Sequence, residues 1–287
     1  MKVLVTGHTG FIGSNLLEFL RRAHEDLLVC SRSTGCDLGQ RDVAQKAVDK
    51  AELVIHLAAD ARPAESLNTP WDTFLTNSQL TTNVALACRD LHVPLVHVSS
   101  CEVYGDFGGV ITEDTRFAPT NPYAASKAAI DRLLYAFYKS YGLDVKIVRA
   151  FNPYGPHQQL NKILPTFFRQ AKEGRPLTVY GDGQDTRDYV YIEDIVRGIW
   201  EARTLPAGEA VNLATGVATT NKHLAEMVLR KLGSHSEILF TQYPKPFGGI
   251  RFQVGSFAKA QELISWKPST SLEDGIEQTF EWLEAIA

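Results

Sequence analysis

The chain has 287 residues, of which 44% are apolar and 22% charged, enough for an ample core in one large domain or a large and a small one. Its formal net charge is -4 and it has no basic block, which argues against nucleic acid or an anionic membrane as the main partner. It shows no signal peptide and no apolar run long enough to span a bilayer, so we expect a cytoplasmic protein. The spacing of the cysteines fits neither C-x-x-C nor a zinc site, so we expect no metal and reduced thiols at Cys30, Cys36, Cys88 and Cys101.

Short apolar runs alternate with helix-like segments over the first half of the chain. This β-α-β alternation predicts an α/β fold, a doubly wound parallel sheet of the Rossmann type with helices on both faces. The predicted strands are Lys2–Thr6, Leu27–Ser31, Leu53–His56, Leu95–Ser99 and Val145–Arg149, and the predicted helices are Phe11–Arg22, Arg41–Lys50, Trp71–Asp90 and Pro122–Tyr141.

The pattern loosens after Asn152, where glycine- and proline-rich loops separate shorter helices. We therefore expect residues 1–152 to form the first domain, with a return of the chain to it near residues 188–215. Residues 153–287 would form mainly a smaller C-terminal domain. Loops are expected at Gly155-Pro156, Gly181–Gly183 and Pro244–Gly249, and helices at Ile163–Glu173, Ile192–Arg203, Lys222–Leu232 and Leu272–Ala285.

A glycine-rich segment follows the first predicted strand and opens the first helix. Its spacing is G-x-x-G-x-x-G at Gly7, Gly10 and Gly13, which differs from the generic G-x-G-x-x-G fingerprint. Glycines at this junction allow a tight turn and a close approach to a pyrophosphate. The helix start, with Phe11 and Ile12, supplies amide donors and the positive end of the helix dipole. The segment therefore predicts a binding site for NAD or NADP.

The residues after the second strand usually discriminate NAD from NADP. An acid there would bind the ribose 2′-hydroxyl, whereas arginine suits a 2′-phosphate. Arg32 stands here without an adjacent acid, which favours NADP slightly, although an arginine that is merely exposed or stacks on adenine stays open. We expect Asp37 and Leu38 to flank the adenine. Small residues after the third strand would let the cofactor backbone pass closely, at Leu57, Ala58 and Ala59.

The segment Asn121–Lys127 is predicted to begin a helix, with Asn121 as its cap and Pro122 at the first helical position. Tyr123 and Lys127 are four residues apart and share one helix face. An ammonium beside a phenol favours the phenolate, so we expect the pKa of Tyr123 to fall below its usual value of about 10. Such a phenol is a base for a sugar hydroxyl, although the same spacing also fits a solvated helix face.

Five motifs occur in order along nearly the whole chain: G-x-x-G-x-x-G, H-L-A-A, V-S-S-C-E-V-Y-G, Y-x-x-x-K and R-A-F-N-P-Y-G-P. Together they resemble the extended short-chain dehydrogenase/reductases, and more narrowly the nucleotide-sugar epimerases and dehydratases. The resemblance implies an NDP-hexose substrate whose C4 hydroxyl is oxidised by bound NAD(P) to a transient 4-keto sugar. Tyr123 would take the hydroxyl proton, Ser100 would hydrogen-bond the same oxygen, and Lys127 would hold the nicotinamide ribose.

The same resemblance assigns roles to other residues and a homodimer to the two long helices 71–90 and 122–141. Residues 1–152 would bind NAD(P), and residues 153–287 would bind mainly the substrate. The substrate diphosphate would meet Asn152, Arg187 and Arg251, and Tyr180 would stack on its base. The sequence does not reveal which sugar or base is bound.

Cys101 and Glu102 follow Ser100 and separate several activities within the family resemblance. The 4,6-dehydratases are similar in having an acid at the Glu102 position, which removes the C5 proton, but they carry Asp at the Cys101 position. The Ser-Cys-Glu triplet also resembles that of the 5,6-dehydratase of tunicamycin biosynthesis. Sugar-nucleotide decarboxylases can also place Glu here. Glu102 as a surface acid and Cys101 as a packing residue stay open.

Two alternatives to a redox-neutral epimerase or dehydratase are considered. Two residues suggest an NADPH-dependent reductase of 4-keto sugars: Arg32, and Ser256 in a segment where many relatives have Asp. A non-catalytic dinucleotide sensor on the same fold is the second alternative. The intact set of Ser100, Tyr123 and Lys127 argues against the sensor, because a sensor does not need a proton-transfer group.

Overall fold

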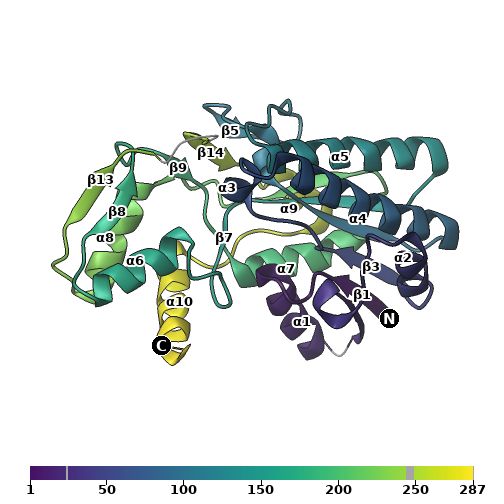
Figure 1. Cartoon of the computed structure of the whole chain (residues 1–287), viewed down its shortest axis with the longest axis horizontal. Coiled ribbons are helices and arrows are strands. Elements are labelled where there is room, and N and C mark those ends of the chain that lie inside the picture. The colour runs from purple at the N-terminus through teal and green to yellow at the C-terminus, as the bar shows by residue number, and fades with distance from the viewer. Residues whose placement is uncertain (24, 244–248, 287) are drawn as a thin grey trace.

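Six parallel strands form the central sheet of the computed structural model, which describes residues 1–23, 25–243 and 249–286 (Figure 1). The strand order is β11-β6-β4-β3-β1-β2, so the chain changes direction across the sheet between β1 and β3. The carboxyl ends of parallel strands meet at one edge, and ligands bind at such a switch point. The strands are β1 (Lys2–Thr6), β2 (Asp26–Cys30), β3 (Leu53–His56), β4 (Leu95–Ser100), β6 (Val145–Ala150) and β11 (Ala210–Leu213).

Helices cover both faces of this sheet, as the alternating pattern predicts (Figure 1). Along β1, Val3 and Val5 join the core that includes α1 (Phe11–Arg22) and α7 (Ile192–Glu201). Leu4 points the other way, into a second core. Successive strand side chains alternate between faces, so both faces of β1 are buried. The helices on the Leu4 side are α2 (Arg41–Val48), α4 (Pro70–Leu91) and α5 (Pro122–Tyr141).

The remaining elements lie mostly at one end of the molecule (Figure 1). A small sheet has the order β12-β9-β14-β5, and two strand pairs join β7 with β10 and β8 with β13. The helices of this region are α6 (Ile163–Lys172), α8 (Asn221–Leu232) and α10 (Leu272–Ile286), and α9 (Ala258–Ile264) contacts β11. The small-sheet strands are β5 (Val110–Ile111), β9 (Thr186–Arg187), β12 (Thr219–Thr220) and β14 (Phe252–Gly255), and the paired strands are β7 (Pro153–Tyr154), β8 (Leu177–Tyr180), β10 (Val190–Tyr191) and β13 (Ile238–Thr241).

The predicted element bounds agree with the structure to within one or two residues for most elements. The second strand begins and ends one residue earlier than predicted, and the helix predicted at Ile192–Arg203 ends at Glu201, where a 3₁₀ turn, η3 (Ala202–Thr204), follows. The sequence pattern predicts neither the short helix α3 (Pro63–Ser66) nor any of the two-residue strands. The loop expected at Pro244–Gly249 lies, except for Gly249, outside the described residues. The division at residue 152 stays a prediction.

The expectation of four reduced cysteines is wrong for two of them. Cys30 and Cys36 form a disulfide, whereas Cys88 and Cys101 are free and buried. The chain leaves β2 at Cys30, makes one 3₁₀ turn, η1 (Arg32–Thr34), and reverses at Gly35, whose φ is 79°. That reversal brings the two sulfurs together, because a left-handed glycine turns the chain back on itself.

Two absences concern the described residues alone. No helix there is long and apolar enough to cross a bilayer. No group of three or more His, Cys, Asp or Glu side chains is arranged there to hold a metal ion.

Candidate active site

The glycine-rich loop lies between β1 and α1, against the carboxyl end of β3. Gly7 has a φ of 70°, and a Cβ there would lie 2.7 Å from the amide nitrogen of Ala58. The Thr6 hydroxyl accepts the amides of Leu57 and Ala58, both at 3.2 Å, and so ties the two strand ends together. Ala59 follows them and is also half-buried. The loop and the small residues after β3 therefore form a single backbone-lined surface at the switch point.

Helix α1 begins at this surface with free amide donors. Its N-cap is Gly10, and no described side chain caps it. The first-turn amides of such a helix lack intrahelical partners and are available to an anion. A Cβ at Gly13 would lie 2.3 Å from the carbonyl oxygen of Gly7, so only glycine allows the helix to pack this closely. Phe11 and Ile12 pack partly against the core. These residues fit the pyrophosphate of a dinucleotide.

Arg32 and Asp37 lie together after β2, at the expected adenosine end. The Arg32 Nε lies 3.9 Å from Asp37 Oδ1, and the two side chains are 73% and 40% exposed. An acid does therefore stand beside Arg32 in space, although it does not follow it in the sequence. Leu38 is placed differently from the expectation, because its side chain is 2% exposed and belongs to the core around α2 and α4.

The start of α5 is fixed from several sides, as its capping sequence predicts. Asn121 Oδ1 accepts the amide of Ala124 at 2.8 Å, and Pro122 occupies the first turn. The Ser66 hydroxyl accepts the amide of Tyr123 at 3.2 Å, and the carbonyl of Tyr123 accepts the Ser126 hydroxyl at 2.7 Å. The backbone of Tyr123 is therefore held in place before any ligand binds.

The expected lowering of the pKa of Tyr123 is wrong for the ligand-free chain. Burial raises it well above its usual value, the Glu102 carboxylate adds to the rise, and a hydrogen bond with Ser100 opposes it. Lys127 is also buried, and burial lowers its pKa to about 8. Its ammonium donates to the carbonyl of Val98 at 2.9 Å. Lys127 is thus anchored to β4 on the helix face that it shares with Tyr123.

Ser100 and Glu102 lie at the carboxyl end of β4, next to Tyr123. The Ser100 hydroxyl accepts the amide of Glu102 at 3.2 Å and caps the short 3₁₀ turn η2 (Cys101–Tyr104). Asn121 Nδ2 donates to Glu102 Oε2 at 2.8 Å, so one residue both caps α5 and holds this carboxylate. Burial raises the pKa of Glu102, and the Asn121 hydrogen bond opposes that rise. Glu102 is half-buried beside the tyrosine and not a surface acid.

Cys101 faces away from the surface, toward β14. Its thiol donates to Gln253 Oε1 at 3.2 Å, and Asn152 Nδ2 donates to the same oxygen at 3.4 Å. Burial raises the pKa of this thiol well above its ordinary value, and the nearby Glu102 carboxylate adds to the rise. Cys101 is therefore a neutral hydrogen-bond donor at neutral pH. Gln253 is fully buried and has no partner for its Nε2 among the described residues.

Arg187 lies beside this cluster, because β9 pairs with β14 in the register Arg187↔Gln253. Arg187 donates to the backbone carbonyl of Thr186 at 3.0 Å and forms no salt bridge with another described residue. Its charge favours the deprotonated forms of both Cys101 and Glu102, which places the Arg187 guanidinium next to these two side chains. Arg187 is thus available to an anionic ligand.

The other predicted diphosphate and base contacts come from three different segments. Arg251 Nε pairs with Asp185 at 2.9 Å, and its Nη2 pairs with Asp182 at 2.9 Å, so its charge is already neutralised. Asn152 Nδ2 donates to the carbonyl of Asp188 at 3.1 Å. Tyr180 ends β8 and is 48% exposed.

Sequence reasoning missed Gln253 and the organising role of Asp188. The buried Asp188 carboxylate accepts the amide and the hydroxyl of Thr215, at 2.8 Å and 2.6 Å. It also accepts the amides of Gly216, at 2.9 Å, and Gly255, at 3.1 Å, so it joins the end of β11 to β14. A signal for Asp188 existed in the run Asp185-Thr186-Arg187-Asp188, whereas Gln253 stands in a short strand with no distinguishing pattern.

Comparison with known proteins places this geometry among nucleotide-sugar enzymes. The model of the NAD dependent epimerase/dehydratase family matches residues 3–214. A dTDP-glucose 4,6-dehydratase of Streptomyces antibioticus is 31% identical over 310 residues, which are 98% of this chain and 92% of that protein.

Solved structures share the whole fold. UDP-glucose 4-epimerase of Thermotoga maritima has a TM-score of 0.94 and 26% identity, and the match covers 100% of this chain and 99% of that one. The dTDP-glucose 4,6-dehydratase DesIV of Streptomyces venezuelae, solved with NAD bound, has a TM-score of 0.92 and 29% identity. That match covers 99% of this chain and 97% of DesIV.

Proposed function

Since the chain belongs to the NAD-dependent epimerase/dehydratase family, we propose that it oxidises the C4 hydroxyl of a nucleotide-linked hexose and then epimerises or dehydrates the transient 4-keto sugar. The observation that carries the proposal is the grouping of Ser100, Glu102 and Tyr123 where β4 meets α5. The carboxyl end of β4 lies on the same sheet edge as the glycine-rich loop after β1.

Ser100, Tyr123 and Lys127 supply the proton transfer at C4. A bound nicotinamide supplies a hydride acceptor and a positive charge near the phenol. Tyr123 takes the proton of the sugar hydroxyl, and the Ser100 hydroxyl stabilises the same oxygen. Burial opposes the phenolate in the ligand-free chain, so the tyrosine becomes a base only when positive charge collects around it. The ammonium of Lys127 provides part of that charge.

Glu102 gives the site a second base, which bears on the step after oxidation. A 4-keto group makes the C5 hydrogen acidic, and a carboxylate with a raised pKa is suited to remove it. Cys101 is less suited to protonate a leaving C6 hydroxyl, because burial makes its thiol a weaker acid and Gln253 already accepts its hydrogen bond. We infer that Glu102 handles the C5 proton and that Cys101 acts as a packed donor.

The NADPH-dependent reductase is not favoured, because the relatives act as epimerases and dehydratases. For the cofactor, we propose NAD, with Asp37 and Arg32 left paired at the adenosine ribose. NADP is the second candidate, because a 2′-phosphate would draw Arg32 away from Asp37. Binding constants for NAD and NADP, measured for wild type and Arg32→Ala, separate the two. If Arg32 binds the 2′-phosphate, Arg32→Ala should weaken the binding of NADP and leave the binding of NAD unchanged.

The substrate diphosphate is proposed to bind at Arg187, whose charge has no carboxylate partner among the described residues. Arg251 would have to exchange its bonds with Asp182 and Asp185 before meeting a phosphate. We propose that Arg251 makes this exchange and binds the phosphate nearer the nucleoside. Asn152 would contact the phosphate nearer the sugar, and Tyr180 would stack on the nucleobase. Arg187→Ala should therefore raise the KM for the nucleotide sugar more than Arg251→Ala does.

Product analysis in deuterated water tests the proposal. The purified protein would be incubated with UDP-glucose, dTDP-glucose or UDP-glucuronic acid and NAD, without an added reductant. Formation of a C4 epimer or a dehydrated 4-keto product supports a redox-neutral reaction, and a strict need for added NADPH contradicts it. Tyr123→Phe should reduce turnover by about 10²-fold to 10⁴-fold while NAD binding is retained.

Two further variants separate epimerisation from dehydration. Glu102→Gln should abolish deuterium exchange at C5 if the enzyme dehydrates, while oxidation at C4 persists. Cys101→Ser keeps a donor to Gln253 and should leave turnover within about threefold of wild type, because the thiol is not the acid. A loss of turnover in Cys101→Ser comparable to that in Tyr123→Phe would contradict this assignment.

We also propose a cytoplasmic homodimer that associates through α4 and α5. These helices pack side by side (Figure 1). Trp71, Phe74 and Leu75 of α4 are 70%, 41% and 45% exposed. Phe74 and Leu75 lie three and four residues after Trp71, so the three side chains share one apolar helix face. Light scattering should report a dimer for wild type and a monomer for Trp71→Glu, and cell fractionation tests the compartment.

A further inference from the structure

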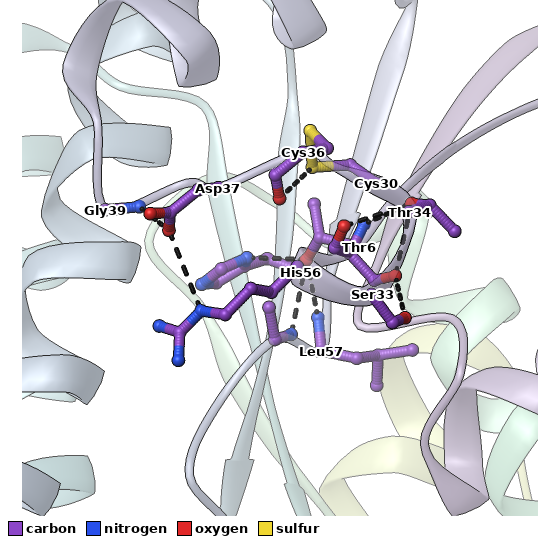
Figure 2. The surroundings of a disulfide bond; sticks show 12 residues. Thr6, Cys30, Ser33, Thr34, Cys36, Asp37, Gly39, His56 and Leu57 are labelled. Atoms are coloured by element: carbon purple, nitrogen blue, oxygen red, sulfur yellow. Dashed lines mark hydrogen bonds and ion pairs between the residues drawn. A yellow bond between two sulfur atoms is a disulfide. The ribbon is translucent and has the colours of Figure 1, made fainter.

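The Cys30–Cys36 disulfide lies directly beside the proposed dinucleotide site (Figure 2). The carbonyl of Cys30 accepts the amide of Gly7 at 2.9 Å, so the strand end that carries one sulfur is bonded to the glycine-rich loop. The amide of Cys36 donates back to the carbonyl of Ser31 at 3.0 Å. The bridge therefore closes a short loop, residues 31–35, whose base is fixed to the loop expected to hold the pyrophosphate.

Besides the backbone hydrogen bonds of its single 3₁₀ turn, the interior of this closed loop is held by small polar side chains. The Ser31 hydroxyl lies 2.8 Å from that of Ser33 and 3.2 Å from that of Thr34. Ser33, Thr34 and Gly35 are exposed, and hydrogen bonds made at a wet surface contribute little net stability. The disulfide is thus the one covalent constraint that keeps the described conformation of this loop.

Both side chains that we propose for the adenosine ribose depend on this loop. Arg32 lies within it, and Asp37 follows the second cysteine directly. Asp37 Oδ1 accepts the amide of Gly39 at 3.1 Å, as Figure 2 shows. The same oxygen lies 3.9 Å from the Nε of Arg32 across the loop. A change in the shape of the loop would move these two groups relative to each other and to Gly7.

We propose that the Cys30–Cys36 disulfide is a positioning element of the cofactor site, which holds residues 31–37 in the shape that takes the adenosine ribose. Its reduction by a dithiol then weakens dinucleotide binding. The inference rests on the proposed NAD(P)-dependent function and deepens it. In the cytoplasm, such a bridge between two cysteines is typical of redox-sensing proteins, because the compartment reduces exposed disulfides.

The reduction step balances with an external dithiol as the two-electron reductant. Cys36 is half-buried and Cys30 is fully buried, so the attack falls on the sulfur of Cys36. A thiolate of the dithiol bonds to that sulfur, the S–S bond breaks, and Cys30 leaves as a thiolate that takes a proton. The second thiol of the reagent then displaces Cys36 as a thiol, and the reagent becomes a cyclic disulfide.

The test measures dissociation constants by calorimetry for NAD and for ADP-ribose, which carries the adenosine ribose but no nicotinamide. The full chain is assayed with and without dithiothreitol, and mass spectrometry after alkylation counts the thiols. We expect reduction to raise both dissociation constants about threefold to tenfold, the range expected when a few loop side chains must be ordered on binding. The double variant Cys30→Ser/Cys36→Ser should show the weaker value in either condition.

Matched controls make each outcome decisive. Cys88→Ala removes one of the buried free thiols and leaves the disulfide intact, so it should respond to dithiothreitol as wild type does. Equal dissociation constants for the oxidised and reduced wild type, with only a lower Tm after reduction, would overturn the inference and assign the bridge to stability alone. That result leaves the proposed function standing. Failure of both forms to bind either ligand would instead overturn the proposed function together with the inference.

Discussion

Gly13 offers the sharpest test of how the glycine-rich loop is built. A Cβ at this position would lie 2.3 Å from the carbonyl oxygen of Gly7 and 2.7 Å from the Cα of His8. Both are backbone atoms that cannot rotate away, and ordinary Cβ contacts begin near 3.4 Å, so α1 would have to move by about 1 Å. Overpacking of this kind costs about 1–3 kcal/mol, and the better helix propensity of alanine offsets up to about 1 kcal/mol.

Gly13→Ala should therefore lower the free energy of unfolding by about 1–2 kcal/mol and the Tm of the ligand-free protein by roughly 2–6 °C. Gly10→Ala is the matched control, since a Cβ there meets only the Gly7 carbonyl, at 3.3 Å. It should change Tm by less than about 2 °C yet weaken NAD binding roughly tenfold, because Gly10 lies in the loop that we propose holds the pyrophosphate. Calorimetry measures both quantities. An unchanged Tm for Gly13→Ala, or a larger drop for Gly10→Ala, would refute the reasoning.

Two further predictions concern buried charges. Burial lowers the pKa of Lys127 to about 8 from 10.5, so between these pH values the unfolded chain binds more protons than the folded one and the free energy of unfolding rises with pH. Urea titrations of the ligand-free protein should show that rise in wild type and not in Lys127→Met; identical pH profiles would contradict it. Asp131 pairs with Arg149 at 2.9 Å inside the protein, and Asp131→Asn should cost about 3 kcal/mol because the arginine stays buried without its partner. Asp42→Asn, in an exposed pair with Lys46, should cost less than about 0.5 kcal/mol, and equal losses would argue against the role of burial.

The backbone frame could be predicted because apolar periodicity and capping residues act locally. Lys2–Thr6 and Pro122–Tyr141 have the predicted bounds, since a short apolar run and an Asn-Pro helix start are both encoded in adjacent residues. The family motifs likewise predict that Ser100 and Tyr123 lie together, and the structure has them hydrogen-bonded at the carboxyl end of β4.

The misses arise from tertiary surroundings that no local pattern contains. The pKa of Tyr123 is raised first by burial and then by the Glu102 carboxylate, and the spacing between Tyr123 and Lys127 contains neither effect. The disulfide depends on the reversal at Gly35, and five residues between two cysteines do not specify such a turn. The thiol of Cys101 meets Gln253 only because β14 comes from a segment 152 residues away.

The placement of β11 limits how this enzyme can be divided or recombined. β11 is an edge strand of the central sheet and pairs with β6, although about sixty residues separate the two strands in the sequence. A fragment cut after residue 152 would leave the hydrogen-bonding groups of β6 bare, which invites aggregation. A chimera that takes everything after residue 152 from a relative would therefore fold poorly unless β11 and α7 stay with the recipient sheet.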